Sequence, residues 1–362
     1  MIIIDKPYVS DFLAKTLEEF SFPVLKNEAA RELLHNRNIH LINEQEALKK
    51  INQEKYPLIY TSSENSIGWI SQNLPDSILP EKIEVFKNKA RFRKLIAGLY
   101  PGFFFREIGL DDINDVPYEE LPSPFIIKPN VGFFSLGVHK VTSGSGWEKL
   151  KPELKKEVAL IRNTYPEEVL NTASFIIEEN IEGEEYTVDA FYDREGNPVI
   201  LGMMHHMFAH EEDTSDRLYL TSPKVIGENL ERFTAFLKDL GKLVDLRNFP
   251  LHLEIRVDEK GRIIPIEGNP LRYGGWCTSA ELTNYAFGFN PYQYVMEGKK
   301  PNWNKILKEH SGHIFSIIIL NNNSGIDARK VKSFDYQKLT GRLEKVLELR
   351  KVNAAQFHIF GF

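Results

Sequence analysis

The segment Leu251–Gly275 carries side chains whose types and spacing fit a metal site. It predicts two strands joined by the turn Asp258–Gly261, because a glycine after polar residues is a hairpin signal. The first strand alternates, so that its apolar residues face one way and His252, Glu254 and Arg256 the other. The second strand carries Glu267 and Asn269. Two carboxylates and an amide oxygen are hard ligands that suit Mg²⁺. A solvated polar face on a half-exposed hairpin explains this stretch, taken alone, equally well.

The register of the hairpin decides whether these side chains converge. If Val257 pairs with Arg262, Glu254 lies opposite Pro265. Glu254 and Glu267 are then diagonal neighbours on one face, roughly 7 Å apart or less. A slip of one residue would turn Glu267 to the opposite face.

A second chemical signal is the lysine at the end of the apolar stretch Phe125–Lys128. The polar loop NVGFFSLG follows, and then a strand is expected at Val138–Val141. A lysine beside a loop with exposed N–H groups can hold phosphates through its point charge and a nest of amides. A surface hairpin explains the pattern as well. Upstream, the basic run Glu84–Tyr100 predicts one helix, whose composition is typical of a solvated face.

The elements that must position these residues begin with a small α/β unit at the N-terminus. Apolar stretches predict strands and helical spacing predicts helices: strands at Met1–Ile4, Ile39–Ile42 and Leu58–Thr61, and helices at Asp11–Phe20 and Glu44–Asn52. Strands that alternate with helices indicate a parallel sheet. No glycine-rich fingerprint follows the first strand, so the sequence does not predict a dinucleotide site.

The middle and C-terminal parts of the chain predict further strands and helices. Strands are expected at Ser174–Glu178, Tyr186–Tyr192, Val199–Phe208, His313–Leu320 and Gln356–Phe360, and helices at Glu228–Val244 and Asp335–Leu349. The polar stretch Ala209–Pro223 is expected to be a loop. His205 and His206 have no acidic residue at ligand spacing, so packing or surface roles are favoured over a metal pair.

Composition bounds the class of protein. The chain has 362 residues, of which 42% are hydrophobic and 27% charged, with a net charge of −6. These values are typical of a globular protein of two or three domains and give no basic field for nucleic acid. The single cysteine, Cys277, excludes an internal disulfide and a multi-cysteine metal site, and is expected to be a buried bystander. No apolar run is long enough for a signal peptide or a membrane span, so a cytoplasmic protein is expected.

Taken in order, four of these segments resemble the ATP-grasp superfamily. They are the lysine-bearing helix KNKARFRKLI, the PFIIKP strand with its loop ending SLGVHKV, the segment IIEENIEGEEYTVD, and the hairpin EIRVDEKGRIIPIEGN. The resemblance runs from Lys87 to Trp276. It implies an α/β fold (α+β in the ATP-grasp part), in which a Rossmann-like domain precedes two ATP-grasp lobes. The expected domains are 1–86, 87–177, 178–300 and 301–362, the last an appendage of the second lobe.

The resemblance also implies a role for particular residues. Two lysines would contact the ATP phosphates, a loop would close over them, a linker would bind the adenine edge, and a carboxylate would take the ribose hydroxyls. The matching positions are Lys89 and Lys128, Ser135 to Gly137, Glu178, Glu179 and Ile181, and Glu185. The metal ligands match Glu254, Glu267 and Asn269, which agrees with the hairpin geometry above.

Two features depart from the usual pattern of the superfamily. The closing loop carries two phenylalanines where glycine and serine are common, and Arg272 stands three residues after Asn269, where an arginine two residues after it is common. Arg272 could hold a substrate carboxylate or the transferred phosphoryl group, or be a structural arginine. Arg256 shares the metal face and could reach phosphate, or form a buried ion pair with a neighbouring carboxylate.

The implied reaction is an ATP-dependent, ADP-forming ligation of a carboxylate to an amine, with ATP and Mg²⁺ (or Mn²⁺) bound between the lobes. The implied partners are small carboxylate and amine substrates, without nucleic acid or membrane, in a homodimer. Two alternatives stay open: an ATP-binding regulatory or scaffold module without turnover, and a kinase-type phosphotransferase. The acceptor pocket would draw on residues 205–224 and 270–285.

Overall fold

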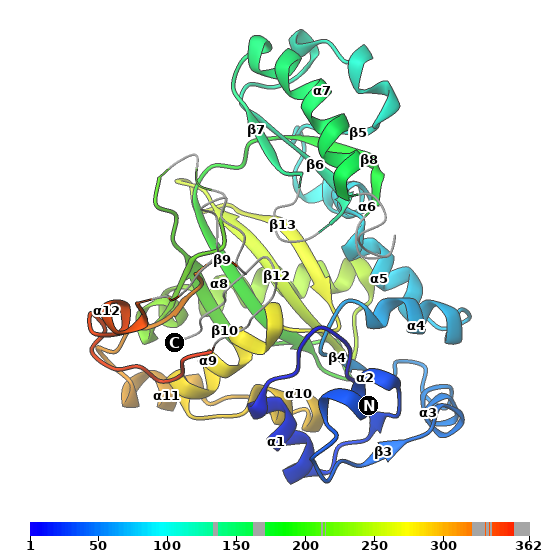
Figure 1. Ribbon diagram of the computed structural model, residues 1–362, viewed down its shortest axis with the longest axis vertical. Coiled ribbons are helices and arrows are strands. Elements are labelled where there is room, and N and C mark those ends of the chain that lie inside the picture. Colours follow the sequence, from blue (N-terminus) through cyan, green and yellow to red (C-terminus); the bar gives the residue numbers. More distant parts are fainter. Residues whose placement is uncertain are drawn as a thin grey trace.

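The computed structural model describes residues 1–132, 137–161, 171–210, 213, 215–320, 330, 333 and 335–350, with only the backbone described for 159–161 and 171–173. These residues form three sheets, as Figure 1 shows. The N-terminal and six-stranded sheets share one continuous core, whereas the four-stranded antiparallel sheet has a core of its own. This separation leaves room for a site between the two antiparallel sheets. No described helix is long and apolar enough to cross a bilayer.

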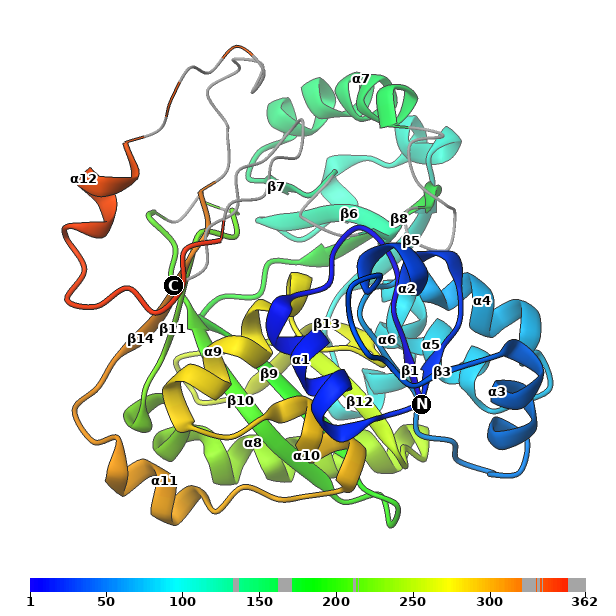
Figure 2. The same ribbon diagram turned by 60° about the horizontal axis from the view of Figure 1, so that its bottom comes forward.

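The N-terminal unit is a parallel sheet with strand order β3-β2-β1-β4, as predicted. Its strands are β1 (Ile2–Ile3), β2 (Val24–Leu25), β3 (Leu41–Ile42) and β4 (Tyr60–Thr61); its helices are α1 (Asp11–Phe20), α2 (Glu28–Leu33), α3 (Glu44–Ile51) and α4 (Ser66–Asn73). Figure 2 shows this unit beside the six-stranded sheet. The sequence reading missed β2 and α2, because two and six residues give too little periodicity to detect.

The basic run predicted as one helix is two helices. They are α5 (Leu79–Lys87) and α6 (Lys89–Ile96), so the prediction of one helix over Glu84–Tyr100 was wrong. Asn88 causes the break, because its backbone is extended and its side chain accepts a hydrogen bond from the Arg91 N–H at 3.0 Å. An asparagine in this role begins a new helix. Lys89 consequently occupies the first turn of α6.

The four-stranded antiparallel sheet has the order β5-β8-β6-β7. Its strands are β5 (Phe105–Gly109), β6 (Phe125–Val131), β7 (His139–Val141) and β8 (Asn171–Glu179), and α7 (Gly144–Ile161) lies on it. Phe125 and Trp147 are fully buried there, with their rings 5.3 Å apart edge to face. The expected strands around Lys128 are confirmed, and Lys128 lies in the interior of β6.

The six-stranded sheet has the order β13-β12-β9-β10-β11-β14 and presents a polar face to the four-stranded sheet. Its strands are β9 (Glu184–Tyr192), β10 (Pro198–His206), β11 (Leu218–Thr221), β12 (Phe249–Val257), β13 (Ile263–Pro270) and β14 (Phe315–Ile318). The long helix α8 (Pro223–Val244) covers the other face, where Gly241 lets the Tyr192 ring approach. β11 lies within the stretch expected to be a loop, so that expectation was wrong for Leu218–Thr221.

Short helices complete the C-terminal part: α9 (Thr278–Phe287), α10 (Pro291–Glu297), α11 (Trp303–Glu309) and α12 (Tyr336–Thr340). The helix predicted over Asp335–Leu349 was wrong beyond Thr340, because α12 ends there after five residues. The strand predicted at Gln356–Phe360 lies outside the described residues. β14 pairs with β11, which attaches this part to the six-stranded sheet. The domain limits given above stay a prediction.

The β12–β13 hairpin forms, but the predicted register was wrong. Val257 pairs with Ile263, and a bulge at Ile266 shifts the register, so that Glu254 lies directly opposite Glu267. Without the bulge, the register at the turn would set Glu254 opposite Ile266 and turn Glu267 away. The extra residue restores both carboxylates to one face. They are therefore cross-strand partners and not diagonal neighbours.

Replacing Gly183 with alanine is expected to destabilise the protein more than the same change at Gly261. Both glycines have positive φ, at +115° and +77°, which costs an alanine about 1–2 kcal/mol. A Cβ at Gly183 would also lie 2.1 Å from the Val257 carbonyl oxygen, whereas Gly261 has open space. Overpacking adds about 1–3 kcal/mol. Chemical denaturation of both variants measures the difference, and equal losses would contradict the packing argument.

Candidate functional site

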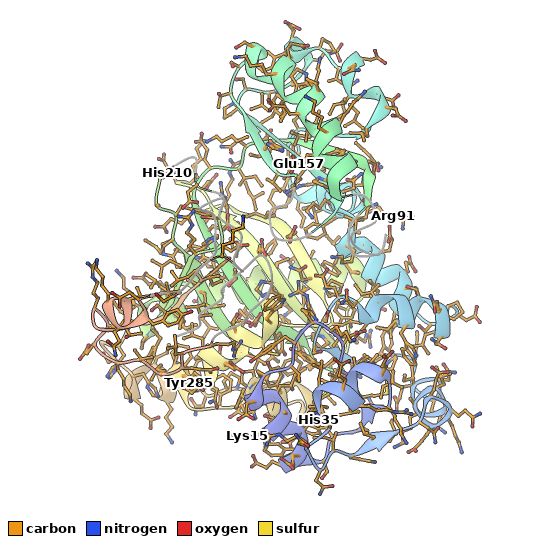
Figure 3. All side chains as sticks on the ribbon, viewed as in Figure 1. Lys15, His35, Arg91, Glu157, His210 and Tyr285 are labelled. Atoms are coloured by element: carbon orange, nitrogen blue, oxygen red, sulfur yellow. The ribbon has the colours of Figure 1, made fainter. Side chains whose placement is uncertain are left out.

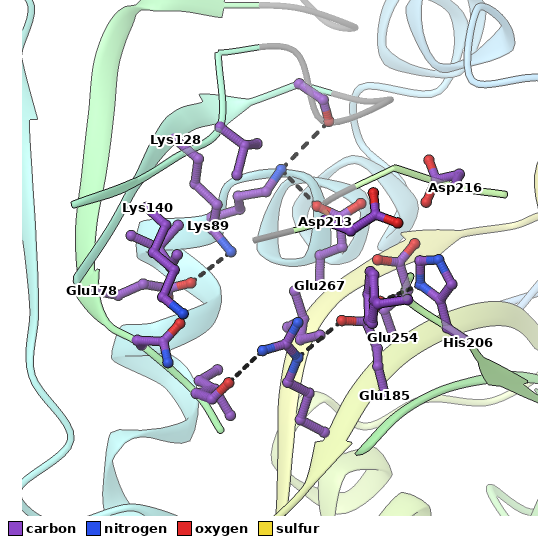
Figure 4. A pocket seen from close by; sticks show the side chains of 18 of the residues that line it. Lys89, Lys128, Lys140, Glu178, Glu185, His206, Asp213, Asp216, Glu254 and Glu267 are labelled. Carbon is purple, nitrogen blue, oxygen red and sulfur yellow. Dashed lines mark hydrogen bonds and ion pairs between the residues drawn. The ribbon is translucent and has the colours of Figure 1, made fainter. Parts of the chain in front are cut away.

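A cavity that is open to solvent lies between the four-stranded and six-stranded sheets. Seven strands of the two sheets, the helix α6 and the segments that join them contribute its walls. The lining residues are Lys89, Ile126, Lys128, Pro129, Gly132, Val138, Lys140, Glu178, Asn180, Ile181, Glu185, His206, Phe208, Asp213, Asp216, Glu254, Arg256, Ile266 and Glu267. Figure 4 shows most of them converging on the same space.

Glu254 and Glu267 of the hairpin both face the cavity, but their pKa values shift in opposite directions. Burial and the nearby carboxylates of Glu267, Glu185 and Asp216 raise the pKa of Glu254 well above its usual range. Burial opposes ionisation of Glu267 too, but its ion pair with Lys89, at 2.8 Å, lowers its pKa. Asn269 lies opposite His252, and these two residues form the next cross-strand pair on the same face of the hairpin. The three predicted ligands thus share one face of the β12–β13 hairpin, but only Glu254 and Glu267 are among the described residues that line the cavity.

Both predicted phosphate lysines reach the cavity. The ammonium of Lys89 is buried and lies between Glu267 and the Gly132 carbonyl oxygen, which it approaches to 3.4 Å. The ammonium of Lys128 pairs with Glu178 at 2.6 Å. The solvated face expected for the basic run holds only for its outer residues: Arg91, at the edge of the view in Figure 3, has its side chain 58% exposed.

The sequence reading missed Arg93, the buried centre of an ion-pair network. Its Nε donates to Glu178 at 2.7 Å and its Nη1 to the Pro265 carbonyl at 2.6 Å. Glu178 therefore lies between two cations, since Lys128 binds its other oxygen. Arg93 is four residues after Lys89, so helical periodicity alone places both on one face of α6. The network connects α6 to both sheets around the cavity.

We predict that the stability of the protein falls at acid pH because of Glu178. Burial opposes its ionisation, but Arg93 and Lys128 lower its pKa from 4.5 to about 2. As pH falls from about 4.5 to 2, the unfolded chain binds a proton that the folded carboxylate resists, so stability is lost in this window. Glu178→Gln should lower the unfolding midpoint at pH 7 and flatten its fall at acid pH. Denaturant titrations at several pH values test this, with the exposed Glu182→Gln as control; an unchanged acid slope would contradict it.

The expected adenine linker reaches the cavity in part. Asn180 and Ile181 line it, whereas the Glu179 side chain turns to the Phe104 N–H at 3.0 Å and does not line the cavity as far as the structure describes it. The Ile181 carbonyl accepts a hydrogen bond from Arg256 at 2.5 Å. Of the expected closing loop, Ser135 lies outside the described residues. Gly137 packs against Pro129, and its φ of +69° requires a glycine.

Glu185 lines the cavity and already has two partners. His206 Nδ1 lies 2.8 Å from one of its oxygens, and Arg256 Nε donates to the other at 3.0 Å. Arg256 therefore forms the ion pair that was one of its two expected roles. His206 was expected to be a packing or surface residue; it is buried, lines the cavity and stacks on Tyr219 at 4.3 Å.

Arg272 lies away from the cavity lining in the described structure. Its guanidinium pairs with Glu64 of the N-terminal unit at 2.5 and 3.0 Å, and Lys87 binds the same carboxylate. Burial opposes ionisation of Glu64, but these two cations lower its pKa to about 2. The arrangement attaches the loop after β13 to the N-terminal sheet.

The segment after β10 also lines the cavity, and it lies within residues 205–224, from which the acceptor pocket was expected to draw. It contributes Phe208, Asp213 and Asp216. Burial raises the pKa of Asp216, whose Oδ1 accepts a hydrogen bond from Tyr219 at 2.8 Å. The Phe208 ring packs against His206, with ring centres 4.1 Å apart and planes tilted by 43°, and lies under the Arg256 guanidinium. This wall of the cavity therefore combines an apolar ring with acidic side chains.

The donor set fits a divalent cation bound together with phosphates. Six carboxylates line the cavity, against four lysine and arginine side chains. Among the residues that the structure describes, no group of three or more His, Cys, Asp or Glu is placed to hold a metal ion. Mg²⁺ usually keeps waters and binds through one or two carboxylates plus substrate phosphates. Glu254 and Glu267, with the amide of Asn269, supply this smaller set.

Comparisons with known proteins give one family and one fold. Residues 121–280 match the family model described as an ATP-grasp domain. No curated protein matches the chain. Among solved structures, an L-amino acid ligase from Bacillus licheniformis superposes with a TM-score of 0.68 at 17% identity, covering 100% of this chain and 89% of that one.

Two other solved structures share the fold. N5-carboxyaminoimidazole ribonucleotide synthetase from Thermotoga maritima has a TM-score of 0.56 at 11% identity, covering 88% of this chain and 80% of that one. The biotin carboxylase domain of 2-oxoglutarate carboxylase from Hydrogenobacter thermophilus has a TM-score of 0.59 at 13% identity, covering 88% and 74%. That domain is a dimer in complex with MgADP, ADP and bicarbonate. At these identities the likeness establishes the fold alone.

Proposed function

Since the chain belongs to the ATP-grasp superfamily, we propose that it is an ATP-dependent ligase that activates a carboxylate as an acyl phosphate and joins it to an amine. The observation that carries the proposal is the composition of one cavity wall. Two lysines and two opposed carboxylates face the space between the two sheets: Lys89, Lys128, Glu254 and Glu267. This is the charge pattern that a triphosphate and a divalent cation require.

In the first step, a carboxylate oxygen of the substrate attacks the γ-phosphorus of ATP and ADP leaves. Lys89 and Lys128 neutralise phosphate charge, so the anionic groups can approach each other. Glu254, Glu267 and Asn269 would hold Mg²⁺, which supplies Lewis-acid stabilisation of the phosphate oxygens. Ile126, Ile181 and Phe208 offer apolar walls for the adenine, and Glu185 is the residue proposed for the ribose.

In the second step, the amine attacks the acyl carbon, phosphate leaves and an amide forms. No protein nucleophile is required, because the chain acts by positioning and by charge stabilisation. The loop 271–277 and the N-terminal unit meet at the Glu64–Arg272 ion pair, and we propose that the acceptor amine enters near this junction. The structural relative named as an L-amino acid ligase supports amino acids as the first substrates to examine.

The test is a screen of carboxylic acids paired with amines, amino acids first, in which ADP release is measured. Hydroxylamine in place of the amine should trap the acyl phosphate as a hydroxamate. The expected result is ADP release that depends on the carboxylate, with an amide product of matching mass. Saturable ATP binding without carboxylate-dependent ADP release would favour a binding module, and a phosphorylated hydroxyl product would indicate a kinase-type transfer.

A further inference from the structure

We propose that the buried pair Asp189–His252 is a positioning unit, which holds the Glu254 carboxylate in place for the divalent cation. The proposal rests on the function proposed above, because it takes Glu254 as a cation ligand. Neither residue of the pair lines the cavity among the described residues. The pair would therefore act through Glu254 and not on the substrates.

The pair is built by the central strands of the six-stranded sheet. His252 on β12 lies directly opposite Asp189 on β9. The imidazole Nδ1 is 2.6 Å from Asp189 Oδ1, and both residues are buried, with exposures of 6% and 3%. A short contact between a carboxylate and an imidazole in a buried place fixes the plane of the ring. The ring therefore has one orientation relative to the sheet.

The fixed orientation turns the other ring nitrogen toward the proposed cation site. His252 Nε2 lies 3.8 Å from Glu254 Oε1. Residues 252 and 254 alternate onto the same face of β12, so their side chains are neighbours. The imidazole thus lies between the carboxylates of Asp189 and Glu254. An N–H directed at Glu254 from the imidazole would restrict its rotamers.

The loop after β13 keeps the pair from moving. The Gly274 N–H donates a second hydrogen bond to Asp189 Oδ1, at 3.1 Å. A Cβ at Gly274 would lie 3.1 Å from His252 Cε1 and 2.6 Å from Ser279 Oγ. Since φ of Gly274 is −53°, it is the space and not the backbone angle that requires glycine. The loop therefore packs closely against the imidazole.

A second carboxylate–imidazole pair, outside the cavity lining, serves as the control. His139 on β7 has its Nε2 2.9 Å from Glu157 on α7, and neither residue lines the cavity among the described residues. Removing a group that orients a metal ligand lowers the metal affinity by about 10- to 100-fold. Removing the imidazole should therefore weaken cation binding at His252 and not at His139.

The experiment measures Mn²⁺ binding to the full-length, nucleotide-free protein by titration calorimetry and by the Mn²⁺ electron paramagnetic resonance signal. Two variants separate the two ring nitrogens. His252→Gln places an amide nitrogen near the position of Nε2, and His252→Asn places one near Nδ1. We expect His252→Asn to weaken Mn²⁺ binding by about 10- to 100-fold, and His252→Gln to retain more affinity than His252→Asn. His139→Asn should bind Mn²⁺ as the wild type does.

Wild-type Mn²⁺ affinity in His252→Asn would overturn the proposal. So would greater retention in His252→Asn than in His252→Gln, because the bond to Asp189 would then be the one that matters. Melting curves of each variant show whether it is folded. Glu254→Gln separates this inference from the proposed function: normal Mn²⁺ binding by that variant would overturn the metal assignment itself, and the positioning role with it.

Discussion

Glu267→Gln is expected to lower carboxylate-driven ADP release by about 1000-fold or more, while most of the affinity for ATP remains. The amide keeps the shape of the side chain but removes its charge from the cation and from Lys89, which lies 2.8 Å away. A cation at the phosphates supplies several kcal/mol of transition-state stabilisation, and each 1.4 kcal/mol changes the rate tenfold. The lysines that bind the phosphates stay in place.

A coupled assay of ADP release and a fluorescent-nucleotide titration measure the two quantities separately. Glu259→Gln is the matched control, because it makes the same change at the exposed turn of the same hairpin. It should behave as the wild type. Unchanged turnover in Glu267→Gln, with the variant folded by circular dichroism, would remove Glu267 from the metal site.

Lys128→Ala is expected to weaken ATP binding or turnover by about 10- to 100-fold. A charge-assisted hydrogen bond contributes about 1.5–3 kcal/mol, and 1.4 kcal/mol corresponds to a factor of ten. Lys128 is buried and lines the cavity, and burial lowers its pKa while Glu178 opposes that shift. Because Lys128 is buried, water screens its positive charge little, and the charge can bind a phosphate group.

The fold should survive this substitution, because Glu178 keeps its ion pair with Arg93 at 2.7 Å. Lys94→Ala serves as the control: that lysine lies on α6, is 59% exposed and pairs with Glu107 at 2.9 Å. Kinetics over a range of ATP concentrations compare the two variants. ATP kinetics in Lys128→Ala that match those of Lys94→Ala would exclude Lys128 from the phosphate site.

Local patterns in the sequence determined the element types and the faces of the main strands. Alternation along β12 placed Glu254, His252 and Arg256 on one face without reference to any other part of the chain, and the structure confirms it. The parallel N-terminal sheet followed from alternating strands and helices. Periodicity reports which side of an element is buried, so features of this kind are readable from sequence alone.

The positions of elements that interrupt a pattern were not readable. The break at Asn88 and the bulge at Ile266 each involve one residue, and neither changes the local composition. A single residue can redirect a chain through its capping bond or its unpaired backbone, whereas periodicity averages over a whole turn or more.

The sequence by itself thus determined the chemistry of the carboxylate pair and of the lysines, and tertiary structure decided which groups surround them. Arg93 and Glu178 are 85 residues apart, Asp189 and His252 are 63 apart, and Glu64 and Arg272 are 208 apart. Ion pairs at such separations depend on how sheets and helices pack, and no local rule of spacing contains that information. The partners of each charged side chain, which set its protonation and its orientation, come only from the folded chain.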